Sequence, residues 1–322
     1  MVIWLTPCSR RTCSAATADS YDKFRLPYPR PLIDDLARRT GADGTGRLLD
    51  LGCGTGQICF ALRDRFADIW AVDQEPDMTA LVRQKAEASG NGACFHVLTC
   101  AAEELDAPAA GFDLVTMGNA FHRMQRDAVA ANVLRWLRPG GHLALLWGGG
   151  PTDGTAPWQQ TLRDVGEHWR HRAGIVDRVP AGHEAARQAR PDAEVLREAG
   201  FEMTGRYEFG FSHEWTADEI AGHAFSTSVL SEAALGDLAP EFAADLQRVL
   251  LAAEPSGRFR QDGTFACDLA CRPSAGPPAG PALCASAPAA TDPMAVPAER
   301  PLDQIVRHQA GRSHRLGARP SR

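Results

Sequence analysis

The chain has 322 residues, of which 44% are hydrophobic and 23% charged, enough apolar material for one catalytic domain with a substrate-binding cap. Its formal net charge is −6, but the segment from Pro273 onward contains three acidic and six basic side chains, so the body before it is at −9. Binding of nucleic acid depends on neutralising phosphates, so an acidic body argues against it and suits a small cationic molecule. Charge that serves solubility alone gives the same pattern.

No apolar run approaches the roughly 20 residues of a membrane span. The first five residues, MVIWL, lack the basic start of a secretory signal peptide, so we expect a cytoplasmic protein. The nine cysteines are scattered without a C-x-x-C pair, which predicts reduced thiols in a core. His168 and His171 lie within one helical turn, but no third ligand accompanies them, so we expect a solvated face and no metal.

Residues 1–18 show no periodicity and are expected to be disordered, and a short amphipathic helix follows over 31–39. Residues 48–56 read LLDLGCGTG, a buried strand that runs into a glycine-rich turn, and a helical pattern continues over 57–62. Three glycines spaced by one residue let the backbone fold tightly where a ligand meets main-chain N–H groups. A dinucleotide-binding fingerprint needs its third glycine three residues after the second, so this spacing argues against a dehydrogenase.

Strands and helices alternate from this turn to Trp147, which predicts a Rossmann-like, mostly parallel sheet with helices on both faces. Asp73 ends the second strand, where a carboxylate takes both ribose hydroxyls of a nucleoside. The further strands are predicted over 69–73, 94–98, 112–117 and 142–147, and the helices over 127–137 and from Pro76.

Helical and strand patterns also follow a loop over 148–154. Residues 273–322, rich in Pro, Ala and Gly, lack a face to bury and are expected to be disordered. The predicted elements are helices over 158–172 and 194–199, a helix from the capping-box residues 216–219 through His223, a helix bearing Phe242, Leu246, Val249 and Leu250, and strands over 201–211 and 264–272.

The stretch from about residue 20 to 150 resembles class I S-adenosyl-L-methionine (SAM)-dependent methyltransferases, in the subgroup with methyltransferase domain type 11. The matching motifs are LLDLGCGTG, AVDQEPDM, AAEEL, FDLVTMGNAFHRM and LRPGGHLALLW. The resemblance implies an α/β fold with a seven-stranded, mostly parallel sheet whose last strand is antiparallel, and a helical cap. It also implies SAM as cofactor and S-adenosyl-L-homocysteine as product. The expected division is a SAM-binding core with an N-terminal lid over 19–150 and a cap with the final strands over 151–272.

The resemblance also implies the cofactor contacts. Asp50 and the three glycines would hold the aminoacyl end of SAM, and Met78 would lie over the adenine, although its alternative is the core. Residues 21–29 resemble a lid segment that folds over SAM, whereas the acid that many relatives carry near Ala101 is missing here. The full set of expected cofactor residues is Tyr21, Arg25, Asp50, Gly52, Gly54, Gly56, Asp73, Met78, Ala102, Glu103 and Asn119.

Methyl transfer is a one-step displacement, so the protein mainly aligns the acceptor with the S–CH₃ bond, and an amine acceptor must first lose a proton. His122 is the candidate base, because it follows the fourth strand and an imidazole titrates near neutrality. Its alternative is a structural lid contact. Relatives often place an aromatic residue where this chain has Arg123.

The cap is expected to recognise the acceptor, through side chains that are each alternatively core or surface. The candidates are Trp158, His213, Trp215, Glu219, His223 and Ser226. The overall pattern is similar to that of N-methyltransferases of gentamicin-type aminoglycoside biosynthesis, which implies methylation of an amino-sugar amine (a 3″-amino group) in antibiotic production. Two alternatives stay open. One is O- or carboxyl-methylation of a small acid or phenol, for which Arg123 and Arg126 would converge on the acceptor; the other is a SAM-binding regulator without catalysis.

Overall fold

The computed structural model describes residues 15–90, 92–175 and 183–274. The chain divides into two units, Met1–Ser274 and Ala275–Arg322, and all described residues belong to the first unit. The disorder predicted from residue 273 onward therefore falls almost wholly outside the described residues, as does most of the disorder predicted at the N-terminus.

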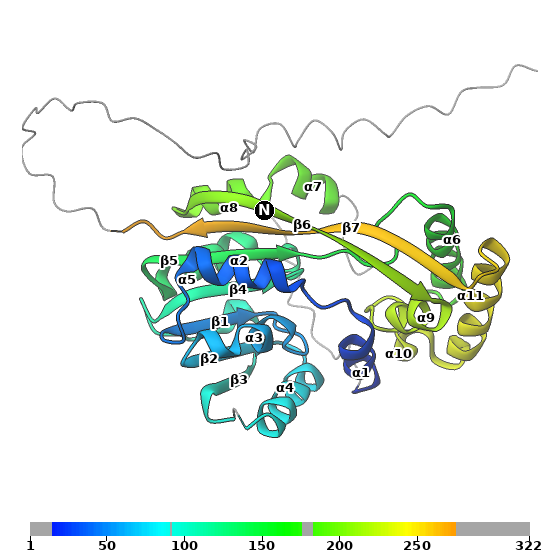
Figure 1. The fold of residues 1–322 in the computed structure, drawn as a ribbon, viewed down its shortest axis with the longest axis horizontal. Helices are drawn as coiled ribbons and strands as arrows, with labels where there is room; N and C mark the ends of the chain where they lie inside the picture. Colours follow the sequence, from blue (N-terminus) through cyan, green and yellow to red (C-terminus); the bar gives the residue numbers. More distant parts are fainter. Residues whose placement is uncertain (1–14, 91, 176–182, 275–322) are drawn as a thin grey trace, which may run out of the picture. The chain divides into compact units, whose positions relative to one another are not determined.

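The first unit is built on a seven-stranded sheet in the order β3-β2-β1-β4-β5-β7-β6 (Figure 1). Neighbours among β1 to β5 pair in parallel, and β7 runs antiparallel to both β5 and β6. This confirms the Rossmann-like fold class. The strands are β1 (Arg47–Leu51), β2 (Asp68–Asp73), β3 (Phe95–Thr99), β4 (Phe112–Gly118), β5 (Leu137–Trp147), β6 (Glu202–Thr216) and β7 (Arg258–Cys271).

Helices connect the strands and form the cap. The helices are α1 (Ala15–Phe24), α2 (Arg30–Thr40), α3 (Gln57–Ala61), α4 (Pro76–Ala88), α5 (Arg126–Trp136), α6 (Pro157–Arg172), α7 (His183–Ala189), α8 (Asp192–Ala199), α9 (Ala217–Phe225), α10 (Glu232–Leu235) and α11 (Ala239–Ala253). Short 3₁₀ turns are η1 (Arg63–Arg65), η2 (Gly92–Cys94), η3 (Ala102–Glu104), η4 (Phe121–Arg123) and η5 (Gly236–Leu238). No helix of the described part is long and apolar enough to cross a membrane.

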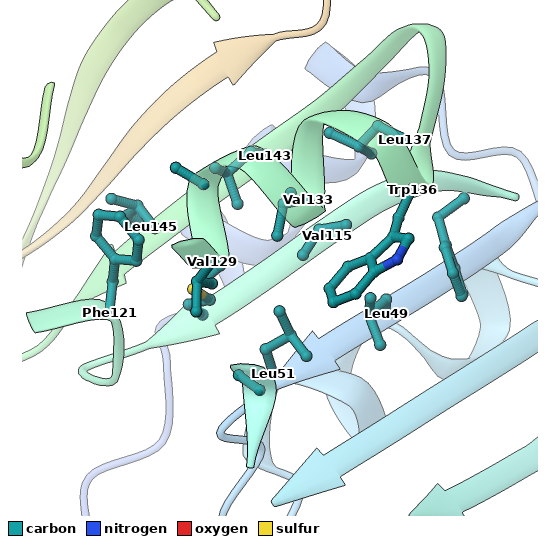
Figure 2. Close-up of a cluster of buried hydrophobic side chains, with 14 of the residues drawn as sticks. Leu49, Leu51, Val115, Phe121, Val129, Val133, Trp136, Leu137, Leu143 and Leu145 are labelled. Atoms are coloured by element: carbon teal, nitrogen blue, oxygen red, sulfur yellow. The ribbon is translucent and has the colours of Figure 1, made fainter. Parts of the chain in front are cut away.

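The two faces of the sheet are covered by different helices, as the alternation of side chains along a strand requires. Leu49 and Leu51 of β1 pack with α5 and α8, whereas Leu48 of the same strand packs with α2, α3 and α4. Figure 2 shows the first of these clusters, in which Trp136 at the end of α5 lies beside Val133 and over the strands, fully buried. Two dry layers therefore hold the carboxyl ends of β1, β2, β4 and β5 in fixed register.

Strands β6 and β7 are much longer than the sequence pattern predicts, and this is a correction to the predicted strands 201–211 and 264–272. Their mutual pairing runs from Glu202–Cys271 to Thr216–Arg258, but β7 pairs with β5 only over its last six residues, Ala266 to Cys271. The outer halves therefore leave the sheet as a two-stranded ribbon that reaches α6, α9 and α11 (Figure 1). Only one face of that ribbon is buried, so polar side chains alternate with apolar ones along it. The apolar runs from which the strands were predicted therefore end before the strands do.

The cap has a core of its own at the far end of the ribbon. It joins side chains of α6, α9, α10 and α11 to the outer ends of β6 and β7. The fully or nearly fully buried aromatics of this core are Trp169, Trp215, Phe242 and Phe259.

Helix α1 corrects a second expectation, because residues 15–18 were expected to be disordered and instead begin this helix. Thr17 and Ala18 are buried, and α1 packs against α9 of the cap and α4 of the core. A Cβ added to Gly222 of α9 would lie 2.3 Å from the ring of Phe24, so the two helices approach as closely as a glycine permits. Tertiary packing, which no local pattern reports, orders this segment.

Candidate functional site

The glycine turn after β1 adopts the conformation that its sequence requires. Gly52, Gly54 and Gly56 have φ values of +64°, +55° and +87°, in the left-handed region that favours glycine. A Cβ on Gly52 would lie 2.8 Å from that of Ala120, so the turn is also closed from the β4 side. The three atoms nearest to a Cβ on Gly54 would belong to the Tyr21 side chain, at 3.5 to 3.7 Å, so this tyrosine of the N-terminal segment lies in van der Waals contact with the turn.

Asp50 lies under this turn rather than in its mouth. Its side chain is fully buried, and its two oxygens accept hydrogen bonds from Thr116 Oγ1 at 2.8 Å and from the Cys59 backbone N–H at 3.2 Å. Burial raises the pKa of Asp50 from 3.8 to about 7. Asp50 thus fixes the start of α3 against β4 and so positions the glycines, and its contact with the aminoacyl end of SAM stays a prediction.

Asp73 lies at the carboxyl end of β2, half-buried, beside the turn. Oδ2 accepts the Gly54 N–H at 2.9 Å and Oδ1 accepts the Glu75 N–H at 2.9 Å. Burial raises the pKa of Asp73 despite these donors. Each carboxylate oxygen has a second lone pair, so the ribose-binding role remains a prediction that this geometry accommodates.

The lid segment crosses above the turn. The guanidinium of Arg25 lies 5.0 Å from the centre of the Tyr21 ring, and Gln57 Nε2 of α3 donates to the Arg25 carbonyl at 3.2 Å. Burial raises the pKa of Tyr21, with Arg25, Asp73 and then Arg123 as its nearest charged influences. Tyr21 and Arg25 are thus brought to the turn as the sequence predicts.

Lys85 is a site residue that the sequence reading missed. Its Nζ donates to the Thr55 carbonyl of the glycine turn at 2.9 Å and to Asp22 Oδ1 of α1 at 2.7 Å. One of only two lysines in the chain therefore ties the lid helix to the turn. The scarcity of lysine in the chain is the sequence feature that could have drawn attention to Lys85.

The remaining cofactor candidates lie at the neighbouring strand ends. Met78 of α4 and Ala102 of η3 are buried, at 5% and 7% exposure, while Glu103 Oε1 accepts the Gln125 N–H at 2.7 Å. These contacts hold η3 beside the start of α5. The proposed adenine contacts of Met78, Ala102 and Glu103 stay predictions.

Asn119 joins the carboxyl ends of β4 and β5. Its φ is +47°, its Nδ2 donates to the Gly148 carbonyl at 3.1 Å, and its Oδ1 accepts the Gly148 N–H at 3.2 Å. Both ends of the side-chain amide are thus engaged by one residue. Asn119 therefore joins the two strand ends, and its contact with the cofactor stays a prediction.

His122 lies in η4, half-buried, immediately after β4. Its ring centre is 5.9 Å from that of Trp147 at the end of β5. Trp147 Nε1 donates to Asp268 Oδ2 at 2.7 Å, and the Arg187 guanidinium lies 4.6 Å from the centre of the Trp147 ring. The indole is therefore held in place, and the imidazole lies beside an aromatic wall at the sheet edge where ligands of such folds bind.

Arg126 does not face the acceptor side. Its Nη1 donates to Asp192 Oδ1 and to the Arg190 carbonyl, both at 2.8 Å, and Arg187 binds the other oxygen of Asp192. Asp192 is 9% exposed, so this is a largely buried ion pair. One of the two arginines expected to converge on an acidic substrate is therefore committed to joining α5 and α8.

Three of the cap candidates have structural partners within the described part of the chain. Trp215 is 1% exposed and donates to Gln261 Oε1 at 2.8 Å, and Trp158 packs in the cap core with its ring centre 5.5 Å from that of Phe259. The carboxylate of Glu219 accepts the Thr216 N–H at 2.8 Å and completes the capping box of α9. These contacts give each residue a structural role, and contact with the acceptor stays a prediction for all three.

His223 and Ser226 lie where lid, cap and sheet edge meet, whereas the half-buried His213 packs against Trp215 on β6. Arg25 Nε donates to Ser226 Oγ at 2.9 Å, and Ser226 Oγ donates to the His223 carbonyl at 2.6 Å. Burial, followed by the charge of Arg25, lowers the pKa of His223 to about 3. Two of the six cap candidates are thus brought close to the lid.

Comparisons with known proteins agree with this geometry. A family model described as "Methyltransferase domain" matches residues 48–141, which include the glycine turn, Asp73 and His122. This stretch of the chain is similar to methyltransferase domains. The chain is 32% identical over 163 residues to an uncharacterised methyltransferase of Mycobacterium tuberculosis, a match that covers 50% of this chain and 61% of that protein. The chain therefore spans less than two thirds of the length of this curated relative.

Two further matches are a curated relative and a solved structure. A demethylmenaquinone methyltransferase of Thermus thermophilus is 36% identical over 103 residues, which cover 31% of this chain and 46% of that protein. A solved structure from Anaeromyxobacter dehalogenans, provisionally titled a type II methyltransferase, superposes with a TM-score of 0.53 at 21% identity, covering 77% of this chain and 97% of that one. The last match bears on the fold alone.

The residues at the glycine turn fit SAM. Tyr21 lies against Gly54 of the turn, a carboxylate lies at the end of β2, and a buried hydroxyl in the turn, Thr55 Oγ1, has no hydrogen-bond partner among the described residues. Together with the domain match, this supports SAM as the cofactor and a class I SAM-dependent methyltransferase as the enzyme class. Within the described ranges, no cluster of three or more His, Cys, Asp or Glu residues could hold a metal ion.

Proposed function

We propose that this chain is a SAM-dependent methyltransferase that N-methylates an amine of a small polar amino sugar, corresponding to the 3″-amino group of gentamicin-type aminoglycosides. The observation that carries the methyltransferase part is the glycine turn, in which the Gly54 N–H donates to Asp73 Oδ2 at 2.9 Å and Tyr21 lies against Gly54. The amino-sugar part is supported by the −9 charge of the body and by the sequence resemblance.

SAM, when bound, would supply the methyl group, and S-adenosyl-L-homocysteine would be the leaving group. The chain's own residues do the remaining work. Asp73 and the glycine turn orient the nucleoside and aminoacyl ends, and the lid, fixed by Lys85 and Gln57, excludes water from the reacting atoms. His122 removes a proton from the acceptor amine, and the aromatic wall at Trp147 keeps its ring in place.

Three acids of the cap region already have partners within the chain, which refines the proposal. Glu214 pairs with Arg258 at 2.6 Å, Asp262 pairs with Arg260 at 3.1 Å, and Glu219 caps α9. Neutral polar groups therefore contribute to recognition of an amino sugar, while the acidic body contributes long-range attraction that falls with ionic strength.

The alternative is O- or carboxyl-methylation of a small acid or phenol. A trans-aconitate 2-methyltransferase of Mycobacterium sp. is 37% identical over 76 residues, which cover 23% of this chain and 30% of that protein. Arg123, exposed in η4, is available to an acidic acceptor, whereas Arg126 is bound to Asp192. A SAM-binding regulator without catalysis is the alternative from another class.

The test is a SAM-dependent turnover screen of the full chain, read by mass spectrometry. The panel contains aminoglycosides and their biosynthetic precursors, phenols, small di- and tricarboxylic acids, and tRNA. We expect a single added methyl group on an amino sugar. A methylated acid or phenol would replace the amino-sugar proposal by its alternative, and SAM binding without any turnover would favour the regulator.

A further inference from the structure

His223 of α9 is surrounded by parts of the chain that are far apart in sequence. The residue is 6% exposed. A Cβ added to Gly150, in the loop after β5, would lie 2.7 Å from both Cε1 and Nε2 of its imidazole. Trp215 packs edge-on to the ring with 5.7 Å between centres, and Arg25 of the lid is the charge that acts on it.

The imidazole lacks a hydrogen-bond partner. Within residues 15–90, 92–175 and 183–274, neither ring nitrogen of His223 makes a hydrogen bond or an ion pair, and its ring contact is with Trp215. Neither ring nitrogen is among the fully buried side-chain atoms of the described residues that lack a partner, so the 6% of His223 that is exposed includes its ring nitrogens. A largely buried imidazole whose nitrogens are still accessible can form a hydrogen bond with a molecule from outside the chain.

Its polar neighbours cannot supply the bond, because they are engaged with one another. Trp215 Nε1 donates to Gln261 Oε1, and Gln261 Nε2 donates to the Gly150 carbonyl, both at 2.8 Å. Arg25 Nε donates to Ser226 Oγ, which itself donates to the His223 carbonyl. The groups around the imidazole thus form a closed frame that leaves the ring to an outside partner.

The position of His223 relative to the strand ends favours the methyl acceptor, rather than the cofactor, as that partner. The glycine turn and Asp73 follow β1 and β2, whereas Gly150 follows β5, and the strand order is β2-β1-β4-β5. The histidine therefore lies two strands away from the cofactor turn, along the same carboxyl edge. His122, which follows β4, lies between the two positions in strand order.

The imidazole is neutral at working pH, because burial and Arg25 hold its pKa at about 3. A neutral imidazole has one N–H donor and one lone-pair acceptor, which a hydroxyl or an amino group can satisfy. An acidic acceptor would gain no charge partner from this ring.

We propose that His223 is a specificity-determining residue whose imidazole forms a hydrogen bond with a hydroxyl or amino group of the methyl acceptor. The inference rests on the proposed methyltransferase function and deepens it, since it names the chemical groups of the acceptor that the cap recognises. Ser226 and Gln261 are positioning residues that hold the lid and the Gly150 loop around the ring.

The first test needs no acceptor. Thermal unfolding of the full chain is compared among wild type, His223→Leu and the control His213→Leu, a half-buried histidine on β6 that packs on the same indole. Leu removes the unpaired nitrogens at similar volume, so we expect the His223→Leu protein to unfold at the same or a higher temperature than wild type. A fall of more than about 4 °C would show that the ring stabilises the fold, and would overturn the proposal.

The second test uses the compound that the turnover screen identifies, with SAM affinity measured by calorimetry for every variant. His223→Leu should keep its SAM affinity and lose about tenfold in kcat/KM, mostly through KM, because one hydrogen bond to the acceptor is lost. His223→Gln, which retains a donor and an acceptor, should recover part of that loss. Full kcat/KM in His223→Leu with SAM binding intact overturns the role of His223 alone, whereas a wild-type chain that binds no SAM overturns the proposed function itself.

Discussion

Lys85 Nζ lies 2.7 Å from Asp22 Oδ1, and through this pair helix α4 holds the lid helix α1 in place. The same ammonium donates to the Thr55 carbonyl at 2.9 Å, so the lid and the glycine turn share one cation. Any motion of α1 that admits SAM must break this ion pair. The lid therefore has a defined latch rather than a general affinity for the core.

Replacing the latch should speed cofactor exchange. In Lys85→Met the apolar stem remains while the ion pair and the carbonyl contact are lost. The pair is about one-third exposed and so is worth about 1 kcal/mol, which predicts about fivefold weaker SAM binding with faster dissociation. Stopped-flow and calorimetric SAM binding give the measurement, with Lys23→Met, the other lysine of the chain, as control. Equal rates of SAM dissociation from the two variants would contradict the proposed role of Lys85 in holding the lid.

Asp73→Ala tests the ribose assignment. Loss of a charged acceptor of two ribose hydroxyls should weaken SAM binding by about ten- to a hundredfold, and the variant should still fold because only two backbone N–H groups lose their acceptor. Calorimetry measures the affinity and circular dichroism checks the fold. Asp77→Asn, on the following helix α4, is the control. Unchanged affinity in Asp73→Ala would contradict the assignment.

Asp50 should make stability depend on pH. Its folded pKa of about 7 lies above its ordinary 3.8, so its contribution to the free energy of unfolding is complete below about pH 4 and is lost as pH rises through 7. Relative to Asp50→Asn, wild type should lose a few kcal/mol over this window. Urea unfolding from pH 4 to 8 measures the difference. Asp43→Asn, at an exposed carboxyl whose pKa is lowered by Thr45, is the control, and parallel wild-type and Asp50→Asn profiles would refute the shift.

His122→Ala distinguishes a base from a lid contact. If the imidazole accepts the proton of the amine, turnover of the identified acceptor should fall by about 10²–10⁴-fold while SAM affinity remains nearly constant. Steady-state kinetics and calorimetry supply the two numbers. His96→Ala, a surface histidine on β3 paired with Asp68, is the control. A full-rate His122→Ala enzyme would make the residue structural.

The core of the fold was predictable because β1, β2, β4 and β5 are buried on both faces and read as continuous apolar runs. The glycine turn was predictable because only glycine adopts its backbone angles and tolerates its neighbours. By contrast, helices α7 and α10 escaped the sequence reading, since helices of seven and four residues depend on packing and leave little periodicity.

Within the site, backbone-determined positions were easier to predict than side-chain partners. Lys85 contacts Thr55 from 30 residues away and Thr116 contacts Asp50 from 66 residues away, and no local spacing announces such pairs. Asn119 and Glu219 illustrate a related point: each is polar and well placed along the chain, and each also forms hydrogen bonds with backbone groups that the sequence does not reveal. Whether a polar side chain is available to a ligand depends on the hydrogen bonds that it forms with residues distant in sequence.

The ribbon of β6 and β7 carries the cap core away from the strands that hold the glycine turn. If the cap binds the acceptor as we propose, α6 and α11 are the cap helices in which substitutions would least disturb the cofactor side, because α9 packs against the lid helix α1. The cap is least tolerant of substitution at the contact of Phe24 with Gly222, where a single added methyl group would collide with the lid.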